Sequence, residues 1–265
     1  MNTKLIAAIA ACGLLAAGNA SAIIVGGVDF GTLGEDPTNQ HIETTTLAET
    51  LITGNGQTLE GYGVVNTVNG DGTYTATGDQ LYFTFSYTSQ NFTPDSVEFI
   101  DGTINLFLGD TFNLLDQSSV ANIGIIESYD EWVQLSGHAF TLTGAELTAN
   151  GTLTGATLSF TGTGMLDVVL GGFGLAEVQT FLDANLIDDG LGGFADMVIT
   201  TSGNNFVLNP HDNTTGCRDG SALAGAWCIA GSADIRGNTV PEPATLGLLG
   251  LGLLGMGAAM RRRKA

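Results

Sequence analysis

The stretch QLYFTFSYTS, Gln80 to Ser89, carries the clearest structural pattern in this chain. Bulky side chains at alternate positions share one face: Leu81, Phe83, Phe85 and Tyr87. The residues between them form the other face: Tyr82, Thr84, Ser86 and Thr88. Because successive side chains of a β-strand point to opposite faces, this two-residue period predicts a half-buried strand.

Similar strand and turn patterns lie on both sides of this segment. DGTINLFLGD, residues 101–110, alternates in the same way, and VNGDGTY, residues 68–74, holds Asn-Gly and Asp-Gly, which tolerate the positive φ of hairpin turns. LTGAELT at 142–148 recurs as LTGATLS at 153–159. A β-solenoid would need a third copy, which does not follow, so we interpret the pair as a hairpin that turns at Asn150-Gly151.

One segment has the period of a helix instead. In LAEVQTFLDANLI, residues 175–187, apolar side chains recur every three or four positions, which predicts a helix of about three turns. Strands resume at MVITTS, residues 197–202. We therefore expect a mainly β protein, built as a single β-sandwich that is jelly-roll-like in outline and carries one short helix.

The N-terminus has the parts of a secretory signal peptide. Lys4 precedes the uncharged apolar stretch 5–17, and Ala20-Ser21-Ala22 places small residues before a cleavage site. Residues 1–22 are therefore predicted to be removed, which leaves 23–239 as the exported domain. A lipoprotein signal ending at Cys12 is the alternative, although its apolar region would be unusually short.

The exported domain is strongly acidic. Residues 23–239 hold 26 Asp and Glu against two Arg, a net charge of 2 − 26 = −24. Such a surface repels nucleic acid phosphates and anionic lipid headgroups, whereas it suits divalent cations or plain solubility.

Two cysteines remain in the exported domain, Cys217 and Cys228. An even pair in a protein bound for an oxidising compartment predicts a disulfide. A metal site would need two further ligands, and only His211 lies near in sequence.

No motif of a known catalytic site is found in the exported domain. It has no HExxH, Gly-x-Ser-x-Gly, P-loop or dinucleotide-binding pattern, so we expect no enzyme activity and no cofactor apart from calcium. The acidic segment DANLIDDGLGGFAD, residues 183–196, offers carboxylates for calcium at Asp188, Asp189 and Asp196, but departs from an EF-hand loop. Turns and helix ends are the alternative use of these side chains.

A second candidate site lies in ESYDEWVQLSGH, residues 127–138. It combines carboxylates with an aromatic side chain, as sugar sites do: Glu127, Asp130, Glu131 and Trp132. In a strand, Asp130 and Trp132 share one face, while Glu127 and Glu131 share the other.

The C-terminus has three successive parts. A rigid tetrad comes first: Val240, Pro241, Glu242 and Pro243. Residues 244–260 are then 17 uncharged positions that would span about 25 Å as a transmembrane helix, near the short limit for a bilayer. Four cations follow and would hold that end in the cytoplasm: Arg261, Arg262, Arg263 and Lys264.

This arrangement, residues 240–265, closely resembles the PEP-CTERM sorting signal of exported bacterial proteins. The resemblance implies recognition by an exosortase, cleavage near the Pro241-Glu242-Pro243 motif, and release from a transient inner-membrane anchor to the cell surface or extracellular matrix of a Gram-negative bacterium. It also implies a link to exopolysaccharide, biofilm or floc formation. The exosortase and the export machinery are the expected partners, with exopolysaccharide as a further one and nucleic acid excluded.

We therefore expect a non-enzymatic exported surface or extracellular-matrix protein. The alternative is a secreted glycan-binding or glycan-active protein that uses the acidic and aromatic cluster at 127–132.

Overall fold

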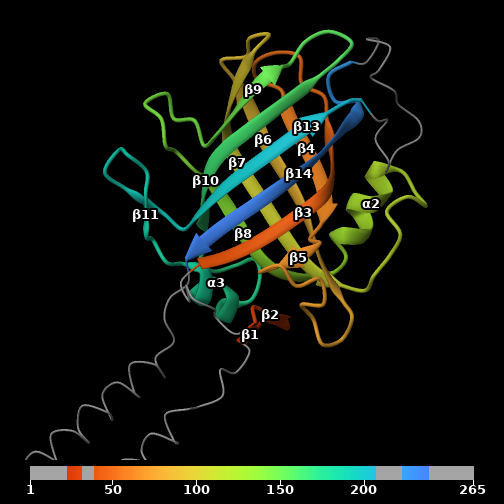
Figure 1. The fold of residues 1–265 in the computed structure, drawn as a ribbon, viewed down its shortest axis with the longest axis vertical. Coiled ribbons are helices and arrows are strands. Elements are labelled where there is room, and N and C mark those ends of the chain that lie inside the picture. The colour runs from red at the N-terminus through yellow and green to blue at the C-terminus, as the bar shows by residue number, and fades with distance from the viewer. Residues whose placement is uncertain (1–22, 32–38, 207–222, 239–265) are drawn as a thin grey trace, which may run out of the picture.

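In a computed structural model, the chain forms a closed antiparallel β-barrel (Figure 1). The structure describes residues 23–31, 39–206 and 223–238. The barrel strands are β3 (Asn39–Thr50), β4 (Thr58–Val64), β6 (Gln80–Gln90), β7 (Ser96–Gly109), β8 (Asp130–His138), β9 (Leu147–Thr152), β10 (Ser159–Val168), β13 (Met197–Asn204) and β14 (Trp227–Asn238). Smaller elements flank them: β1 (Ile24–Val25), β2 (Val28–Asp29), β5 (Thr67–Val68), α2 (Ser119–Ile126), α3 (Ala176–Leu182), β11 (Ile187–Asp188) and β12 (Phe194–Ala195).

The barrel is an up-and-down meander in eight positions. Going round it, the order is β13, β14, β3, β4, β6, β7, β8 with β9, and β10, and β10 pairs back with β13. The predicted β-sandwich is therefore wrong. Alternating strands look the same in a sandwich and a barrel, and the difference lies in β14, which pairs with β13 on one side and with β3, distant in sequence, on the other.

Strands β8 and β9 share one position of the barrel, end to end between β7 and β10. On β7, Thr103 pairs with β8 and Phe99 pairs with β9. The predicted hairpin between the repeated segments is present, but its turn is not at Asn150-Gly151. Gly151 pairs with Phe160 inside the ladder, and the chain turns over residues 153–158.

The expected turn at Asn69-Gly70 is found. Both residues have positive φ, 51° and 79°, and the backbones of Val68 and Asp71 exchange hydrogen bonds across it. Strand β6 also follows the prediction, because Leu81, Phe83 and Tyr87 pack in the barrel core.

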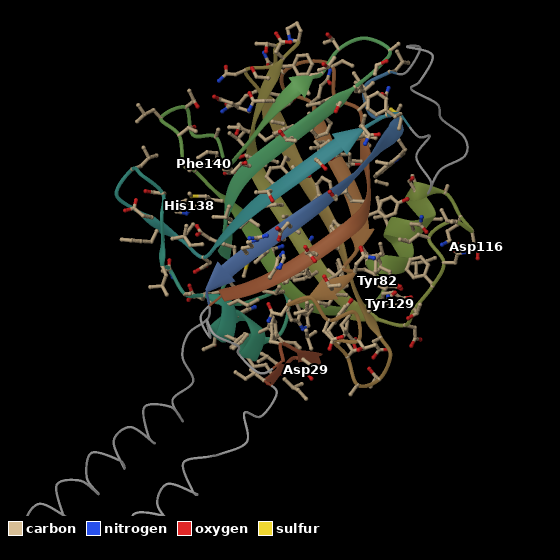
Figure 2. All side chains as sticks on the ribbon, viewed as in Figure 1. Asp29, Tyr82, Asp116, Tyr129, His138 and Phe140 are labelled. Atoms are coloured by element: carbon tan, nitrogen blue, oxygen red, sulfur yellow. The ribbon has the colours of Figure 1, made fainter. Side chains whose placement is uncertain are left out.

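The opposite face of β6 is more buried than its pattern suggests. Tyr82 is 1% exposed, because α2 and the segment before it cover this part of the outer wall. Figure 2 places Tyr82 and Tyr129 together on that side, and their ring centroids are 5.6 Å apart. The sequence does not predict helix α2, because it is only eight residues long and its buried face carries the polar Ser119 and Asn122 while the apolar Val120 is 70% exposed.

The lower end of the barrel in Figure 1 is closed by β1, β2 and α3. Phe30 is 1% exposed and its ring lies 5.0 Å from that of Phe181 on α3. Helix α3 confirms the predicted helix but ends at Leu182, and residues 187–188 instead form β11.

Within the described residues, no helix is long and apolar enough to cross a membrane. The predicted signal peptide, residues 1–22, and the predicted transmembrane helix, residues 244–260, lie outside the described part of the chain.

Candidate functional site

Several predicted sites fall outside the described residues. These are the tetrad Val240, Pro241, Glu242 and Pro243, and the basic tail Arg261, Arg262, Arg263 and Lys264. Cys217 lies outside them as well, so its bridge to Cys228 stays a prediction; Cys228 itself is buried, with 2% exposure.

The acidic and aromatic cluster does not assemble a sugar platform. Glu127 caps the C-terminal end of α2, and Asp130 and Glu131 are exposed at the start of β8. Trp132 is fully buried, stacks on Phe30 with 6.3 Å between ring centroids, and donates from Nε1 to the carbonyl oxygen of Gly26 at 3.0 Å.

A β-bulge explains the position of Trp132. Glu131 pairs with Phe107 and Val133 with Leu106, so Trp132 has no partner on β7. Bulges redirect the side chain of the extra residue. Here Trp132 packs against the segment that closes the lower end of the barrel, and it is not accessible to a glycan.

The three proposed calcium ligands do not converge. The carboxylates of Asp188 and Asp189 each accept backbone N–H groups of the β11–β12 turn, and those from Leu191 and Gly193 lower the pKa of Asp189 to about 2. Asp196 is 1% exposed and accepts from the backbone N–H groups of Val168 and Asn185. These carboxylates hold turns together, which is the alternative that the sequence left open.

His138 lies between two carboxylates at the β11 side of the barrel (Figure 2). Its Nδ1 is 2.7 Å from Asp167 and its Nε2 is 3.1 Å from Asp189. Burial acts to lower the pKa of His138, but the hydrogen bonds and negative charges of the two carboxylates raise it overall. The trio therefore joins β8, β10 and the β11–β12 turn by charge-assisted hydrogen bonds.

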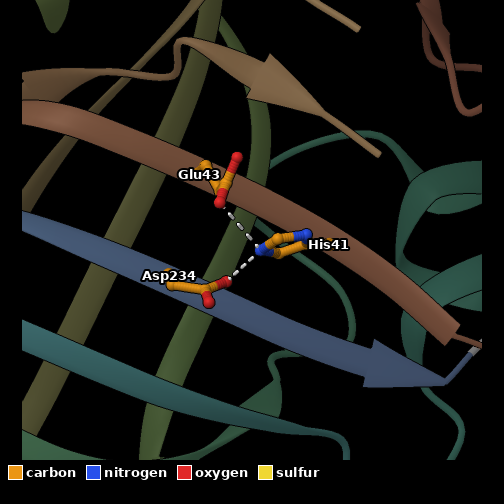
Figure 3. A group of neighbouring side chains, drawn as sticks. All are labelled: His41, Glu43 and Asp234. Carbon is orange, nitrogen blue, oxygen red and sulfur yellow. Dashed lines mark ion pairs between the residues drawn. The ribbon is translucent and has the colours of Figure 1, made fainter. Parts of the chain in front are cut away.

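A second histidine cluster lies on the outer wall where β3 meets β14 (Figure 3). His41 Nε2 is 2.5 Å from Asp234 Oδ1 and 3.4 Å from Glu43 Oε1. Among the described residues, this is the one group of three possible metal ligands whose ligand atoms all lie within 4.8 Å of one another. One imidazole and two carboxylates suit Zn²⁺, which binds three protein ligands and a water, better than Ca²⁺, which takes six to eight oxygens.

A neighbouring cation competes for the same carboxylate. Arg236 donates to Asp234 Oδ2 from Nε at 3.0 Å and from Nη2 at 2.8 Å. The cluster can therefore act either as an ion-pair network or as a site for a divalent cation.

The barrel encloses an apolar cavity with a volume of about 90 Å³. All eight positions of the barrel contribute to its lining or to the apolar core around it. Three close aromatic contacts shape the wall: a Cβ on Gly61 would lie 2.0 Å from the Phe85 ring, one on Gly102 2.1 Å from the Tyr87 ring, and one on Gly203 2.3 Å from the Phe160 ring. Glycine at these positions leaves the space that each ring occupies.

One carboxyl group lines this cavity. Glu49 is 4% exposed, and burial without a charged partner raises its pKa to about 8. Its position in the sequence indicates it: Glu49 lies midway between Leu47 and Leu51, which directly follows β3, and both leucines line the cavity. The two-residue period predicts an apolar side chain at such a position. An ionisable residue in such a place is a reason to look for a site.

The comparisons with known proteins concern the C-terminus. A family model described as the PEP-CTERM protein-sorting motif matches residues 239–264. No curated protein and no solved structure matches the chain. The match covers the tetrad, the apolar run and the basic residues, and it confirms the resemblance seen in the sequence. The chain therefore carries a PEP-CTERM sorting motif, which marks it as an exosortase substrate and implies export and surface localisation.

Proposed function

We propose that the protein is a non-enzymatic component of the cell surface or extracellular matrix, where it associates with exopolysaccharide and contributes to biofilm or floc formation. In this proposal the host is Gram-negative and residues 244–260 anchor the chain only until the exosortase cuts it. The observation that carries the proposal is the sorting motif at residues 239–264.

The charge of the exported domain supports a matrix role. With a net charge of −24 over residues 23–239, the domain repels other polyanions unless cations lie between them. Divalent cations would therefore link it to an acidic polysaccharide, and the His41, Glu43 and Asp234 cluster offers one place for such an ion.

The glycan-active alternative has weaker support. Its aromatic residue, Trp132, is buried, so it offers no stacking surface to a glycan beside the three carboxylates. We therefore place polysaccharide association on the acidic exterior instead of on residues 127–132.

The test is a gene deletion in the native host, complemented with the natural chain or with a chain in which Pro241, Glu242 and Pro243 are replaced by alanine. We expect the deletion to reduce the polysaccharide retained in the matrix, and the natural chain to restore it. The altered chain should stay with the membrane fraction and fail to restore it. Unchanged retention in the deletion strain would contradict the matrix role.

A second measurement addresses the absence of catalysis. Purified protein incubated with polysaccharide from the same host should release no new reducing ends and should not change the polymer's size distribution. Time-dependent release of reducing ends that scales with protein concentration would show an enzyme.

A further inference from the structure

The interior of the barrel has more open space than a close-packed protein core leaves. Protein cores hold few voids larger than a water molecule. The cavity here has a volume of about 90 Å³, which is room for several water molecules. Eight-stranded barrels are just wide enough to be filled by their own side chains or to hold one small ligand, and this one leaves room for the ligand.

The wall of the cavity is almost entirely apolar. Its polar lining residues are Thr44, Glu49, Thr50, Tyr87 and Thr201, and no described Lys, Arg or His contributes to it. Leu, Ile, Val, Phe and Ala side chains form the rest. Such a wall favours an uncharged hydrocarbon body.

The three threonines have partners in the barrel wall. Their hydroxyl groups donate to backbone carbonyl oxygens: Thr44 to Val64 at 2.6 Å, Thr50 to Glu60 at 3.3 Å, and Thr201 to Ser232 at 2.9 Å. These hydroxyl groups are used by the fold itself.

Glu49 and Tyr87 are different. Glu49 Oε1 and Tyr87 Oη are buried and make no hydrogen bond with the described part of the chain. The two residues are 4% and 2% exposed. Since an unpaired buried polar group costs stability, both atoms point to a partner that comes from outside the chain.

Both side chains are held in place within the barrel. A Cβ on Gly203 of β13 would lie 2.7 Å from Glu49 Oε1, so the carboxyl group extends from β3 across the inner face of β14. The Tyr87 ring lies over Gly102 and packs edge-on against Phe99, with 6.1 Å between centroids. Two fixed hydrogen-bonding groups in an apolar chamber are the usual features of a small-molecule site.

The charge of the occupant follows from the lining. An anionic head group would have no cation to pair with and would face a carboxyl group. A cationic head group would require an ionised Glu49 in apolar surroundings, which burial disfavours. A neutral hydroxyl or carbonyl group can accept from Tyr87 Oη or from a protonated Glu49, and a hydroxyl group can also donate to Glu49.

We propose that the barrel interior binds one uncharged, mainly apolar molecule that carries a hydroxyl or carbonyl group, and that Glu49 and Tyr87 supply its hydrogen bonds. The proposal is independent of the matrix role, because it concerns the inside of the barrel and not its acidic exterior.

The experiment uses the full chain and the fluorescent apolar probe N-phenylnaphthylamine, displaced at neutral pH by decanol, decanoate or decylammonium. We expect saturable binding of one decanol per chain, and at least tenfold weaker displacement by the two charged ligands. Tyr87→Phe and Glu49→Leu should each weaken decanol binding about threefold to tenfold, the loss of one hydrogen bond.

A matched pair of variants locates the binding. Ala149 lines the cavity and is 3% exposed, whereas Ala121 is exposed on α2. Ala149→Phe should abolish decanol binding, and Ala121→Phe should leave it unchanged. If Ala149→Phe fails to fold, Ala233→Leu fills the cavity from β14.

Three results would overturn the proposal. Probe fluorescence that stays at its value in buffer would mean that the chamber takes up no apolar molecule. Binding that survives in the folded cavity-filling variant would place it elsewhere, including on the apolar C-terminal run that all variants share. Equal affinity for decanol and either charged ligand would refute the assignment of a neutral head group.

Discussion

Replacing Glu49 with glutamine should make the stability of the barrel much less dependent on pH. The substitution keeps the shape and hydrogen-bonding capacity of the side chain but removes its titration. The pKa of Glu49 rises from an ordinary 4.5 to about 8 because burial disfavours the carboxylate. The folded state therefore favours the protonated side chain, whereas the unfolded state releases the proton at a lower pH.

The size of the effect follows from that shift. A raised pKa in the folded state gives stability that is complete below about pH 4.5 and is lost as the pH rises through about 8. Each unit corresponds to about 1.4 kcal/mol, so the natural chain loses about 5 kcal/mol across this window through Glu49. This is a large part of the roughly 5–15 kcal/mol that stabilises a typical domain.

Urea unfolding between pH 5 and pH 9 measures the effect directly, with linear extrapolation to water. Trp132 and Trp227 are 0% and 8% exposed, so their fluorescence reports unfolding of the barrel. The difference between the Glu49→Gln variant and the natural chain should grow in favour of glutamine as the pH rises, then level off above pH 8.

Taking the difference between the two proteins removes the general effect of their acidic surface, which is nearly the same in both. Tyr87 does not interfere, because burial raises its pKa above the range studied. A difference that stays constant from pH 5 to pH 9 would refute the reasoning, since it would mean that Glu49 is not in apolar surroundings.

Three further predictions concern other parts of the fold. His138→Gln should lower the melting temperature more at pH 5.5 than at pH 9. The pKa of His138 is raised in the folded state, so the stabilisation it gives is complete below about pH 6.5 and is lost as the pH rises through the folded-state pKa. An equal loss at both pH values would contradict this. Gly61→Ala should cost about 1–3 kcal/mol in urea unfolding, since its Cβ would lie 2.0 Å from the Phe85 ring and 2.8 Å from the carbonyl oxygen of Ala48, and a neutral result would show that the ring moves freely. Zn²⁺ should raise the melting temperature of the natural chain but not of Asp234→Asn, and an equal shift in both would exclude the cluster in Figure 3 as a metal site.

The strands could be predicted because their side chains alternate in an ordered way. β6 and β7 were located from bulky residues at every second position, and the turn at Asn69-Gly70 from residues that tolerate positive φ. These are local properties, and a short stretch of sequence contains them.

The closure of the barrel could not be predicted in the same way. It depends on the pairing of β14 with β3, which joins residues far apart in sequence: Ile235 and Ile42, for example, are 193 positions apart. The buried position of Trp132 has a similar origin, because it depends on a bulge opposite β7 and on residues 23–30 packing beneath it. Glu49 can be noticed in the sequence as a carboxylate between two leucines at alternate positions. It indicates a binding site only once these residues are known to line a cavity.

Barrel closure also limits how the exported domain can meet its surroundings. Each position of the barrel has a hydrogen-bonded neighbour on both sides, so its main strands offer no free edge to a second chain. Association with a matrix must then use side chains on the outer wall, which carries the acidic groups, while a small apolar molecule inside would be shielded from that matrix. A bulge in β3 between Thr44 and Leu47 reverses the alternation of side chains, so Glu43 lies on the outer wall and Glu49 faces the cavity. A change at Glu43 or Asp234 and a change at Glu49 should therefore act on separate properties, matrix association in the first case and ligand binding in the second.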